Sequence, residues 1–325
     1  MAKPPRFVPR DTSRRRMSVY LAVGAFIAVD ILLIALALSS HRVGAEAGAP
    51  QAAPSITAPA STSTSTASPA PAAEAEAEAV LPLPPTRLLG AVDENTAWRA
   101  VTGDCPATAA SPELTTDGGD TWKTTDATGP TEVTALQRLI VTSEGVVEMV
   151  GLTEADCAPA FVKTFVGGDN YSSYPDKVAE TWFIDPADRA NVHTPSGSVK
   201  SPCEAVVTVA ARDDESASVL CADGRLFYTT DATTWFPFSA LPGVVSLTAT
   251  NFGFMAATVG RSECLGVQIL SSTTSPDWVA GGCFETATAP SDLAGRVALS
   301  SSAGAVWLWA GDEFVRSVAG GSDWK

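Results

Sequence analysis

Six cysteines are the residues of this chain whose spacing most restricts their chemistry. None forms a Cys-x-x-Cys pair, and none lies at zinc-ligand spacing from His193, the only histidine after residue 83. Zinc binding is therefore disfavoured, and a catalytic cysteine would have only His193 as a histidine base. An even number of cysteines is typical of structural disulfides in an oxidising compartment, and we expect three. The six residues are Cys105, Cys157, Cys203, Cys221, Cys264 and Cys283.

Acidic residues dominate the chain from residue 83 onward, where 30 Asp and Glu stand against 14 Lys and Arg. A surface with this charge repels a phosphate backbone, so we expect no nucleic-acid partner. The run Asp213-Asp214-Glu215 fits a solvated hairpin tip better than a Ca²⁺ site. The chain also lacks a phosphate-binding Gly-Lys-Ser/Thr loop, a dinucleotide fingerprint and a thioredoxin-like cysteine pair. We therefore expect no metal and no cofactor.

One apolar segment, residues 17–39, is long enough to cross a membrane. Its length of about 23 residues spans ~30 Å of hydrocarbon at ~1.5 Å per residue. Three arginines at residues 14–16 precede it and the pair His41-Arg42 follows, so the positive-inside rule places the N-terminus in the cytoplasm. A cleaved signal peptide is the alternative. The segment exceeds the ~7–15 residues of a signal core, which favours a retained anchor.

Asp30 lies inside this apolar segment, where a charged side chain costs roughly 2.5–3.5 kcal/mol on insertion scales. We therefore expect its carboxyl group to be protonated or to contact a partner within the membrane. Gly24 and Ala28 form a small-xxx-small pair that allows a second helix to approach closely, although such pairs are common in apolar segments. Asp30 is accordingly the predicted contact to a membrane partner.

Composition divides the chain into four parts. Residues 1–16 form a basic cytoplasmic tail, and residues 17–39 form the transmembrane helix. Residues 40–82 are rich in Ala, Pro, Ser and Thr and have too few large apolar side chains to fold, so we expect a disordered stalk. Residues 83–325 are long enough to bury a sizeable core and form an extracellular domain. The prediction is a single-pass protein of the cell membrane with its C-terminal domain outside.

The strongest motif in that domain lies at residues 115–122. Its residues resemble the Asp-box, Ser/Thr-x-Asp-x-Gly-x-Thr-Trp, at every defined position. The chemistry is that of a turn, because the carboxylate accepts backbone N–H groups, glycine adopts positive φ and the indole covers the hairpin. In Asp-box families this turn joins the third and fourth strands of a β-propeller blade, away from the binding face, and the resemblance implies the same here. The defined residues are Thr115, Asp117, Gly119, Thr121 and Trp122.

Weaker copies of the motif follow at intervals. Their markers are Tyr171, Asp231 with Trp235, Trp278 and Trp324. From Trp122 onward the aromatic markers are separated by 49, 64, 43 and 46 residues, close to the ~40–50 residues of a propeller blade. Short strand-like runs lie between them, and no long amphipathic helix follows the membrane segment. The sequence therefore predicts an all-β propeller of about five blades.

Blade spacing also suggests how the cysteines pair and how the ring closes. Hairpin geometry favours Cys203–Cys221 and Cys264–Cys283 within single blades, which leaves Cys105–Cys157 to bridge adjacent blades, one choice among fifteen pairings. Trp324 is followed by a single residue, so the last blade has no room for its outermost strand. We expect residues 79–83 to supply that strand and close the ring.

The longest interval between markers contains an excess of about 20 residues, near residues 176–203. We expect a long loop there, and loops on rigid scaffolds often carry function. Trp182, Phe183 and His193 are the candidate binding residues in it. An ordinary insertion, with Trp182 packed against a blade and His193 exposed, is the alternative.

Asp-box propellers include sialidases and other glycoside hydrolases, so hydrolysis has to be considered. Such enzymes need two placed carboxylates, or a Tyr nucleophile with a Glu and a clamp of arginines. The chain has no Arg-x-Pro motif of the sialidase type, and no Ser-His-Asp triad can be assembled around His193. We therefore favour a non-catalytic binding or scaffold module of the cell envelope that takes a protein, peptide or glycan. The resemblance extends to assembly-factor propellers, whose basic patches this acidic domain lacks; a glycoside hydrolase is the alternative.

Overall fold

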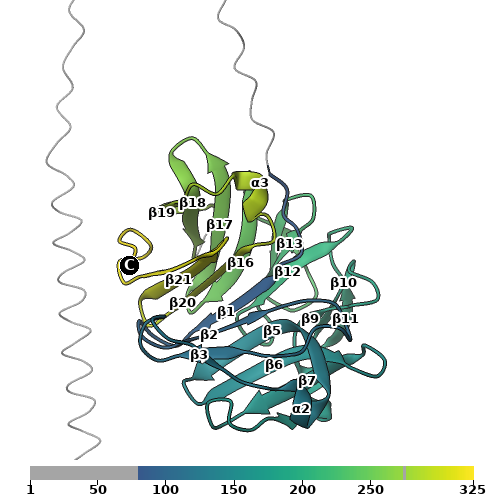
Figure 1. Cartoon of the computed structure of the whole chain (residues 1–325). Helices are drawn as coiled ribbons and strands as arrows, with labels where there is room; N and C mark the ends of the chain where they lie inside the picture. Colours follow the sequence, from purple (N-terminus) through teal and green to yellow (C-terminus); the bar gives the residue numbers. More distant parts are fainter. Residues whose placement is uncertain (1–79, 274–275) are drawn as a thin grey trace, which may run out of the picture. The chain divides into compact units, whose positions relative to one another are not determined.

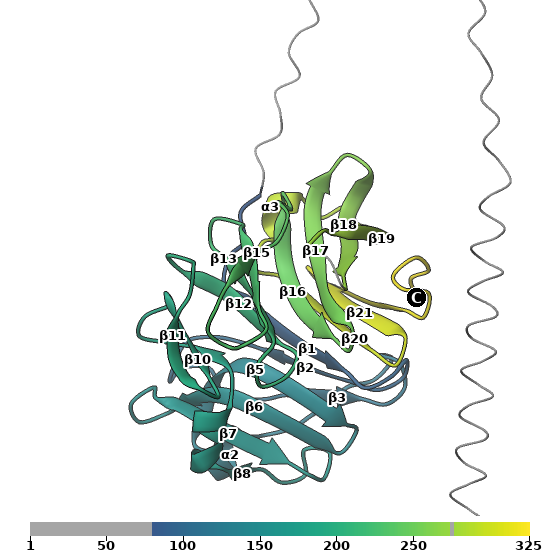
Figure 2. The ribbon, with the colours of Figure 1, turned by 180° about the vertical axis from the view of Figure 1, so that it is seen from behind.

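The computed structural model describes residues 80–273 and 276–325. In these residues the chain forms six antiparallel sheets, each built from strands that follow one another in sequence. The innermost strands contact one another in the order β1, β5, β9, β12, β16 and β20, and β20 contacts β1. Six sheets in a closed ring form a six-bladed β-propeller (Figures 1 and 2).

The first half of the propeller contains blades 1 to 3. Blade 1 consists of β1 (Arg87–Ala91), β2 (Ala97–Val101), β3 (Glu113–Thr115) and β4 (Lys123–Thr124). The short helix α2 (Thr128–Thr131) leads to blade 2, which consists of β5 (Val133–Ser143), β6 (Val146–Thr153), β7 (Pro159–Thr164) and β8 (Ser172–Ser173). The 3-10 helix η1 (Pro175–Glu180) leads to blade 3, which consists of β9 (Phe183–Ile184), β10 (Asn191–Thr194) and β11 (Gly197–Lys200).

The second half contains blades 4 to 6. Blade 4 consists of β12 (Val206–Ala211), β13 (Ala217–Cys221), β14 (Leu226–Thr229) and β15 (Phe236–Pro237). Blade 5 consists of β16 (Val244–Thr250), β17 (Gly253–Arg261), β18 (Cys264–Ser272) and β19 (Val279–Glu285). The short helix α3 (Pro290–Leu293) leads to blade 6, which consists of β20 (Val297–Ser302), β21 (Ala305–Ala310) and β22 (Glu313–Ser317). Blades pack face to face, so second strands such as β13 are buried on both faces and are nearly continuous apolar runs.

The structure has one blade more than the five that the marker spacing predicts. The additional blade is blade 3, which forms at residues 183–200, where the sequence predicts a long loop. The markers count turns that follow a third strand and return the chain along it, whereas blade 3 ends at its third strand, β11, and the chain passes directly to β12 of blade 4. The predicted count and the predicted loop are both wrong for this reason.

Blade 3 runs in the opposite sense to its neighbour. Trp182, directly before β9, donates its indole N–H to the Asp213 carbonyl (3.0 Å), just beyond the end of β12. Arg189, in the hairpin after β9, bonds to the Val206 carbonyl (2.7 Å) at the start of β12. These contacts make β9 antiparallel to β12. A blade of four strands returns the chain to the end of the propeller at which the blade begins. A blade of three strands leaves the chain at the other end. The chain therefore begins blade 3 at the end opposite to that at which it begins blades 2 and 4.

The ring closes between blade 6 and blade 1 without exchange of a strand. Of the residues predicted to complete the last blade, residues 80–83 form no strand, and residue 79 lies outside the described part. The C-terminus extends blade 6 instead, because the Lys325 backbone exchanges two hydrogen bonds with Arg316 (2.9 and 3.0 Å). Val80 packs against the core shared by blades 5 and 6. The predicted closure is therefore wrong.

Indole N–H groups connect neighbouring blades in a repeated way. Trp98 of blade 1 bonds to the Glu144 carbonyl of blade 2 (3.2 Å), and Trp307 of blade 6 bonds to the Asp93 carbonyl of blade 1 (2.8 Å). Trp182 makes the equivalent bond to blade 4. In each case the acceptor lies in the hairpin after the first strand of the following blade. Such bonds satisfy a buried indole and restrict the rotation of one blade against the next.

The three disulfides join the pairs that the sequence predicts. Cys105–Cys157 bridges blades 1 and 2, Cys203–Cys221 holds the start of blade 4, and Cys264–Cys283 lies within blade 5. Each pair includes a cysteine in or beside a connection between a second and a third strand. We call this end of the propeller the disulfide face. The opposite end, where second strands follow first strands and fourth strands follow third strands, is the turn face.

The predicted membrane anchor lies outside the described residues, together with Asp30, the basic tail at residues 1–16 and residues 40–79 of the stalk. Within residues 80–273 and 276–325, no helix combines the length and apolar character needed to cross a bilayer. The anchor and its topology stay predictions from the sequence.

Candidate functional site

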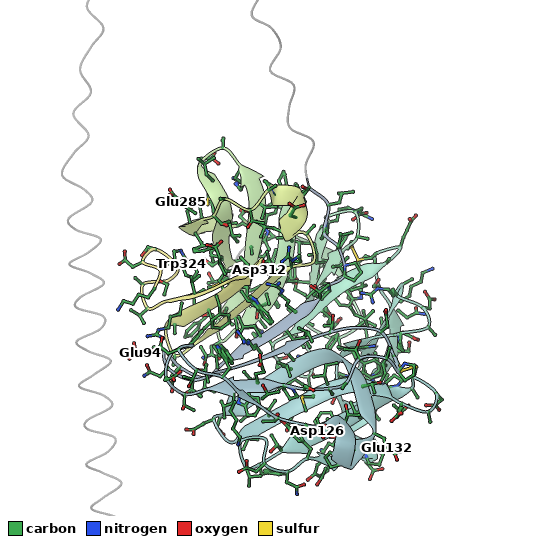
Figure 3. The ribbon with its side chains drawn as sticks, in the orientation of Figure 1. Glu94, Asp126, Glu132, Glu285, Asp312 and Trp324 are labelled. Carbon is green, nitrogen blue, oxygen red and sulfur yellow. A yellow bond between two sulfur atoms is a disulfide. The ribbon has the colours of Figure 1, made fainter. Side chains whose placement is uncertain are left out.

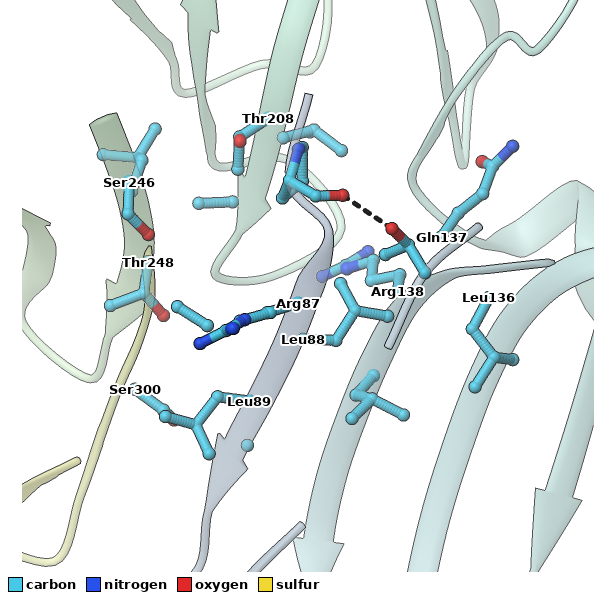
Figure 4. Close-up of a pocket in the computed structure, with 18 of the residues that line it drawn as sticks. Arg87, Leu88, Leu89, Leu136, Gln137, Arg138, Thr208, Ser246, Thr248 and Ser300 are labelled. Atoms are coloured by element: carbon cyan, nitrogen blue, oxygen red, sulfur yellow. Dashed lines mark hydrogen bonds between the residues drawn. The ribbon is translucent and has the colours of Figure 1, made fainter. Parts of the chain in front are cut away.

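A cavity of about 760 Å³ lies on the propeller axis, and all six innermost strands contribute to its wall. We call it the channel. Figure 4 shows part of the wall, with Arg87 of β1 and Arg138 of β5 among side chains of the other inner strands. A cavity of this size holds a small ligand or a short peptide segment.

The channel is positively charged although the domain around it is acidic. Its wall includes Arg87, Arg138 and Arg189 and a single acidic residue, Asp104. Charges along a narrow channel with low-dielectric walls focus the electric field, so a carboxylate is attracted there and repelled by the outer surface. Acidic side chains on that outer surface include Glu94, Asp126, Glu132 and Glu285 (Figure 3).

Arg138 connects three blades through its buried guanidinium group. From β5 of blade 2 it donates to the Trp182 carbonyl (3.0 Å) beside blade 3 and to the Ala211 carbonyl (3.4 Å) of blade 4. Trp182 directly precedes β9, the two-residue inner strand of blade 3, and Ala211 ends β12, so one guanidinium holds the inner edges of blades 3 and 4 against blade 2. Burial lowers the pKa of Arg138 to about 10, a change that nearby Glu148 opposes. The group therefore remains a cation at neutral pH.

Arg189 acts in the same way at the start of blade 4. Its Nε and Nη2 donate to the Val206 carbonyl (3.0 and 2.7 Å), and Nη2 also donates to the Val207 carbonyl (3.2 Å). Burial lowers the pKa of Arg189. Among the described residues, no carboxylate forms an ion pair with Arg138 or Arg189, so the charge of both reaches the channel without a bonded counter-ion.

Arg87 lies where the channel meets the interface of blades 1 and 6. Its guanidinium stacks over Trp309 (4.5 Å) and makes a long contact to Asp312 (3.5 Å), which also pairs with Arg296 at 2.8 Å. Burial, followed by the charge of Arg296, lowers the pKa of Arg87. Its Nη1 is buried and has no hydrogen-bond partner within residues 80–273 and 276–325. A single exposed carboxylate thus serves two guanidinium groups.

Hydroxyl groups also line the channel. Thr208, Ser246, Thr248 and Ser300 come from β12, β16 and β20 and are labelled in Figure 4. The Ser300 hydroxyl accepts a hydrogen bond from the Ala91 backbone (2.9 Å) of blade 1. Hydroxyls both donate and accept, and guanidinium groups only donate, so the combined set matches a ligand that carries carboxylates and amides.

The candidate binding residues of the expected loop lie inside blade 3. Trp182 and Phe183 are only 3% and 6% exposed, because they pack into the interfaces of blade 3 with its neighbours. His193 stacks on Phe183 (4.4 Å between ring centroids), and its Nδ1 lies 2.9 Å from the Thr181 carbonyl. The predicted arrangement as an exposed loop is therefore wrong, and Trp182 offers no free ring face to a ligand. Phe183 still reaches the channel wall.

The motif at residues 115–122 forms the turn between β3 and β4, on the turn face. Asp117 accepts the Thr121 backbone N–H (2.9 Å) and the hydroxyls of Thr115 (2.8 Å) and Thr121 (2.5 Å). Gly119 has a φ of 97°, and its carbonyl accepts the Trp122 indole N–H at 3.1 Å. The network is local and closed, so these residues build a hairpin and are not available for catalysis.

The other markers lie in corresponding turns. Asp231 accepts the backbone N–H groups of Thr233 and Thr234 (2.9 and 2.6 Å) between β14 and β15, in the turn that precedes Trp235. Tyr171 lies between β7 and β8; its hydroxyl is 2.7 Å from that of Thr125, and burial raises its pKa to about 12. Trp278 packs on Phe238 (4.9 Å) before β19, and Trp324 donates to the Cys283 carbonyl (3.0 Å).

Acid should weaken the turn of blade 1. Hydrogen bonds from Thr121 lower the pKa of Asp117 to about 2 from an ordinary value of 3.8. A carboxylate with a lowered pKa contributes stability above its unfolded pKa and loses it as the pH falls through the folded pKa. We expect the melting temperature of Asp117→Asn to fall less between pH 4 and pH 2 than that of the natural protein. Asp120→Asn, one residue outside the network, is the control and should retain the natural pH dependence.

Sequence reasoning missed the three channel arginines. Their partners are distant along the chain; 73 residues separate Arg138 from Ala211. A signal was nonetheless present, because Arg138 directly precedes the apolar run Leu139-Ile140-Val141 of an innermost strand. Within residues 80–273 and 276–325, no group of three or more His, Cys, Asp or Glu side chains is arranged to hold a metal ion.

Comparison with known proteins finds similarity of fold. No family model matches the chain, and no curated protein matches it. The structure of YCF48 bound to D1 peptide is 18% identical over 75% of this chain and 82% of that one, with a TM-score of 0.28. The GH74 xyloglucanase from Xanthomonas campestris is 13% identical over 71% and 44%, with a TM-score of 0.38. Trypanosoma rangeli sialidase is 12% identical over 75% and 47%, with a TM-score of 0.31. This chain therefore spans less than half of either enzyme.

Proposed function

We propose that this chain is a membrane-anchored, extracytoplasmic propeller that binds an acidic peptide segment of an envelope protein in its channel without chemically changing it. The observation that carries the proposal is the channel wall, where Arg87, Arg138 and Arg189 face one acidic residue. The apolar segment at residues 17–39 and the arginines before it support the anchor and its orientation.

The charge distribution supports selection of an acidic ligand. With 30 acidic and 14 basic residues from residue 83 onward, the outer surface repels a polyanion and leaves the channel as the place where one is attracted. Charge complementarity of this kind raises association rates and excludes wrong partners. The Cys105–Cys157 bridge ties the connection containing Asp104, which is part of the wall, to blade 2. A wall fixed before binding lowers the entropy lost on binding.

The test measures binding of labelled pentaglutamate and pentalysine peptides to the full chain, purified in detergent with its disulfides intact. Pentaglutamate should bind, more weakly as salt rises, and pentalysine should not. Arg189→Met should weaken pentaglutamate binding by about tenfold, the effect of ~1.4 kcal/mol. Arg225→Met removes a positive charge outside the channel and is the matched control, expected to bind like the natural protein.

Two results would contradict the proposal. Equal binding of both peptides, or equal binding by the Arg189 and Arg225 variants, would mean that the channel does not select acidic ligands. Release of sugar from an envelope glycan by the full chain would instead support the glycoside hydrolase that the sequence leaves as the alternative.

A further inference from the structure

One stretch of the channel wall is apolar, where blade 1 faces blade 2. Leu88 of β1 and Leu139 and Val141 of β5 line the channel and pack against the core that the two blades share. Val141 also lies directly against Gly90 of β1, where a larger residue would leave it no room. The three side chains therefore form one continuous surface, which we call the apolar wall.

The apolar wall remains accessible from the channel. Its three side chains are only half-buried, whereas Leu136, which lies in the same strand as Val141 and also lines the channel, is 1% exposed. Apolar surface inside a cavity is where a ligand gains most free energy by displacing water. A ligand with carboxylates alone would leave this surface unused.

Polar groups lie across the channel from the apolar wall. In a closed ring of six blades, blade 4 is opposite blade 1, and its inner strand β12 contributes Thr208 to the channel. Arg189 bonds to the Val206 carbonyl at the start of the same strand and also lines the channel. One side of the channel therefore carries the apolar wall, and the opposite side carries a guanidinium and a hydroxyl group.

This arrangement selects a ligand by the order of its side chains as well as by its charge. Successive side chains of an extended peptide point to opposite sides, so a residue turned toward the apolar wall directs both of its neighbours toward Arg189 and Thr208. We infer, on the basis of the proposed function, that the acidic peptide carries a large apolar residue between two acidic ones. The apolar residue packs against Leu88, Leu139 and Val141, and its acidic neighbours bond to the polar groups opposite.

The test compares two pentapeptides of equal charge, with a central leucine or a central glutamine between two glutamates on each side. Calorimetric titration of the full chain, in detergent and with its disulfides intact, should show the leucine peptide binding about tenfold more tightly, an effect of ~1.4 kcal/mol. Glutamine is close to leucine in size but polar, so the ratio of the two affinities reports contact with apolar surface. Both affinities are measured on the same protein, so the ratio does not depend on the stability of that protein.

Variants locate the leucine in the channel. Val141→Thr places a hydroxyl where the apolar wall has a methyl group, and it should lower the ratio to about threefold. Arg189→Met should weaken both peptides by a similar factor and leave the ratio unchanged, because it removes a charge and leaves the apolar wall intact. Val279→Thr, the same change at a side chain that is 67% exposed on the outermost strand of blade 5, is the matched control and should retain the tenfold ratio.

Three outcomes would overturn the inference. Equal binding of the leucine and glutamine peptides would overturn it and leave the proposed function standing. Failure of both peptides and of pentaglutamate to bind would overturn it together with the proposed function. A preference for leucine that Val141→Thr does not change would mean that the leucine binds away from the apolar wall.

Discussion

Arg138→Met is expected to lower the free energy of unfolding by about 1–3 kcal/mol, because it leaves two partly buried carbonyls without their guanidinium donor, at a cost of up to about 1–3 kcal/mol each. The carbonyls belong to Trp182 and Ala211. Removing the buried charge recovers part of its desolvation cost, which keeps the net loss below the sum. At about 2–4 °C per kcal/mol for a domain of this size, the melting temperature should fall by roughly 2–12 °C.

The place of the loss identifies its cause. Arg138 joins β5 to blade 3 and blade 4, so amides of β9, β10 and β11 should lose hydrogen-exchange protection before those of blade 5. Arg138→Lys retains the cation but offers fewer, less suitably directed donors, and its stability should fall between that of Arg138→Met and that of the natural protein. Arg225→Met, on an exposed ion pair, should change stability by less than about 0.5 kcal/mol. If Arg138→Met were as stable as the natural protein, the guanidinium would not support blade 3.

Local features of this fold could be predicted from the sequence because their partners are close along the chain. The Asp117 carboxylate has all of its hydrogen-bond partners within residues 115–122, so residue types alone predict the turn. Two of the three disulfides span 18 and 19 residues and follow from hairpin geometry, and the third follows by elimination. The structure contains the three disulfides and has the Asp117 turn between β3 and β4.

Blade 3 could not be predicted in the same way. Its strands have two, four and four residues, too few to establish an alternation of apolar and polar positions. It has no turn of the Asp117 type. The start of its inner strand is held by Arg138 of blade 2, which donates to the Trp182 carbonyl and also to the Ala211 carbonyl of blade 4. Trp182 and Phe183 are predicted as loop residues because the short strands of blade 3, which bury them, carry no recognisable pattern. The channel could not be predicted for a related reason. All six inner strands line it, so its wall can be assigned only when all six blades are predicted.

Trp307→Ala should have the largest effect of any single change, a loss of about 3–5 kcal/mol. The Trp307 side chain is fully buried, bonds to the Asp93 carbonyl (2.8 Å), and packs with Ala91 and Ala97 of blade 1. No disulfide crosses the interface between blades 6 and 1, because the three pairs use all six cysteines elsewhere. Truncation should therefore open the ring there, and β1 and β20 should lose hydrogen-exchange protection first.

Trp98→Ala is the matched comparison. Trp98 is equally buried and bonds across the interface of blades 1 and 2, but the Cys105–Cys157 disulfide also crosses that interface. With the disulfide intact, Trp98→Ala should lower the free energy of unfolding, but β1 and β5 should not lose hydrogen-exchange protection early. After the disulfide is reduced, the interface of blades 1 and 2 should open in Trp98→Ala as the interface of blades 6 and 1 does in Trp307→Ala. Trp307→Phe keeps an aromatic ring but loses the N–H donor, so it should cost only about 1–2 kcal/mol. Uniform loss of protection over all six blades in Trp307→Ala would show that the ring unfolds as one unit and that this interface is no weaker than the others.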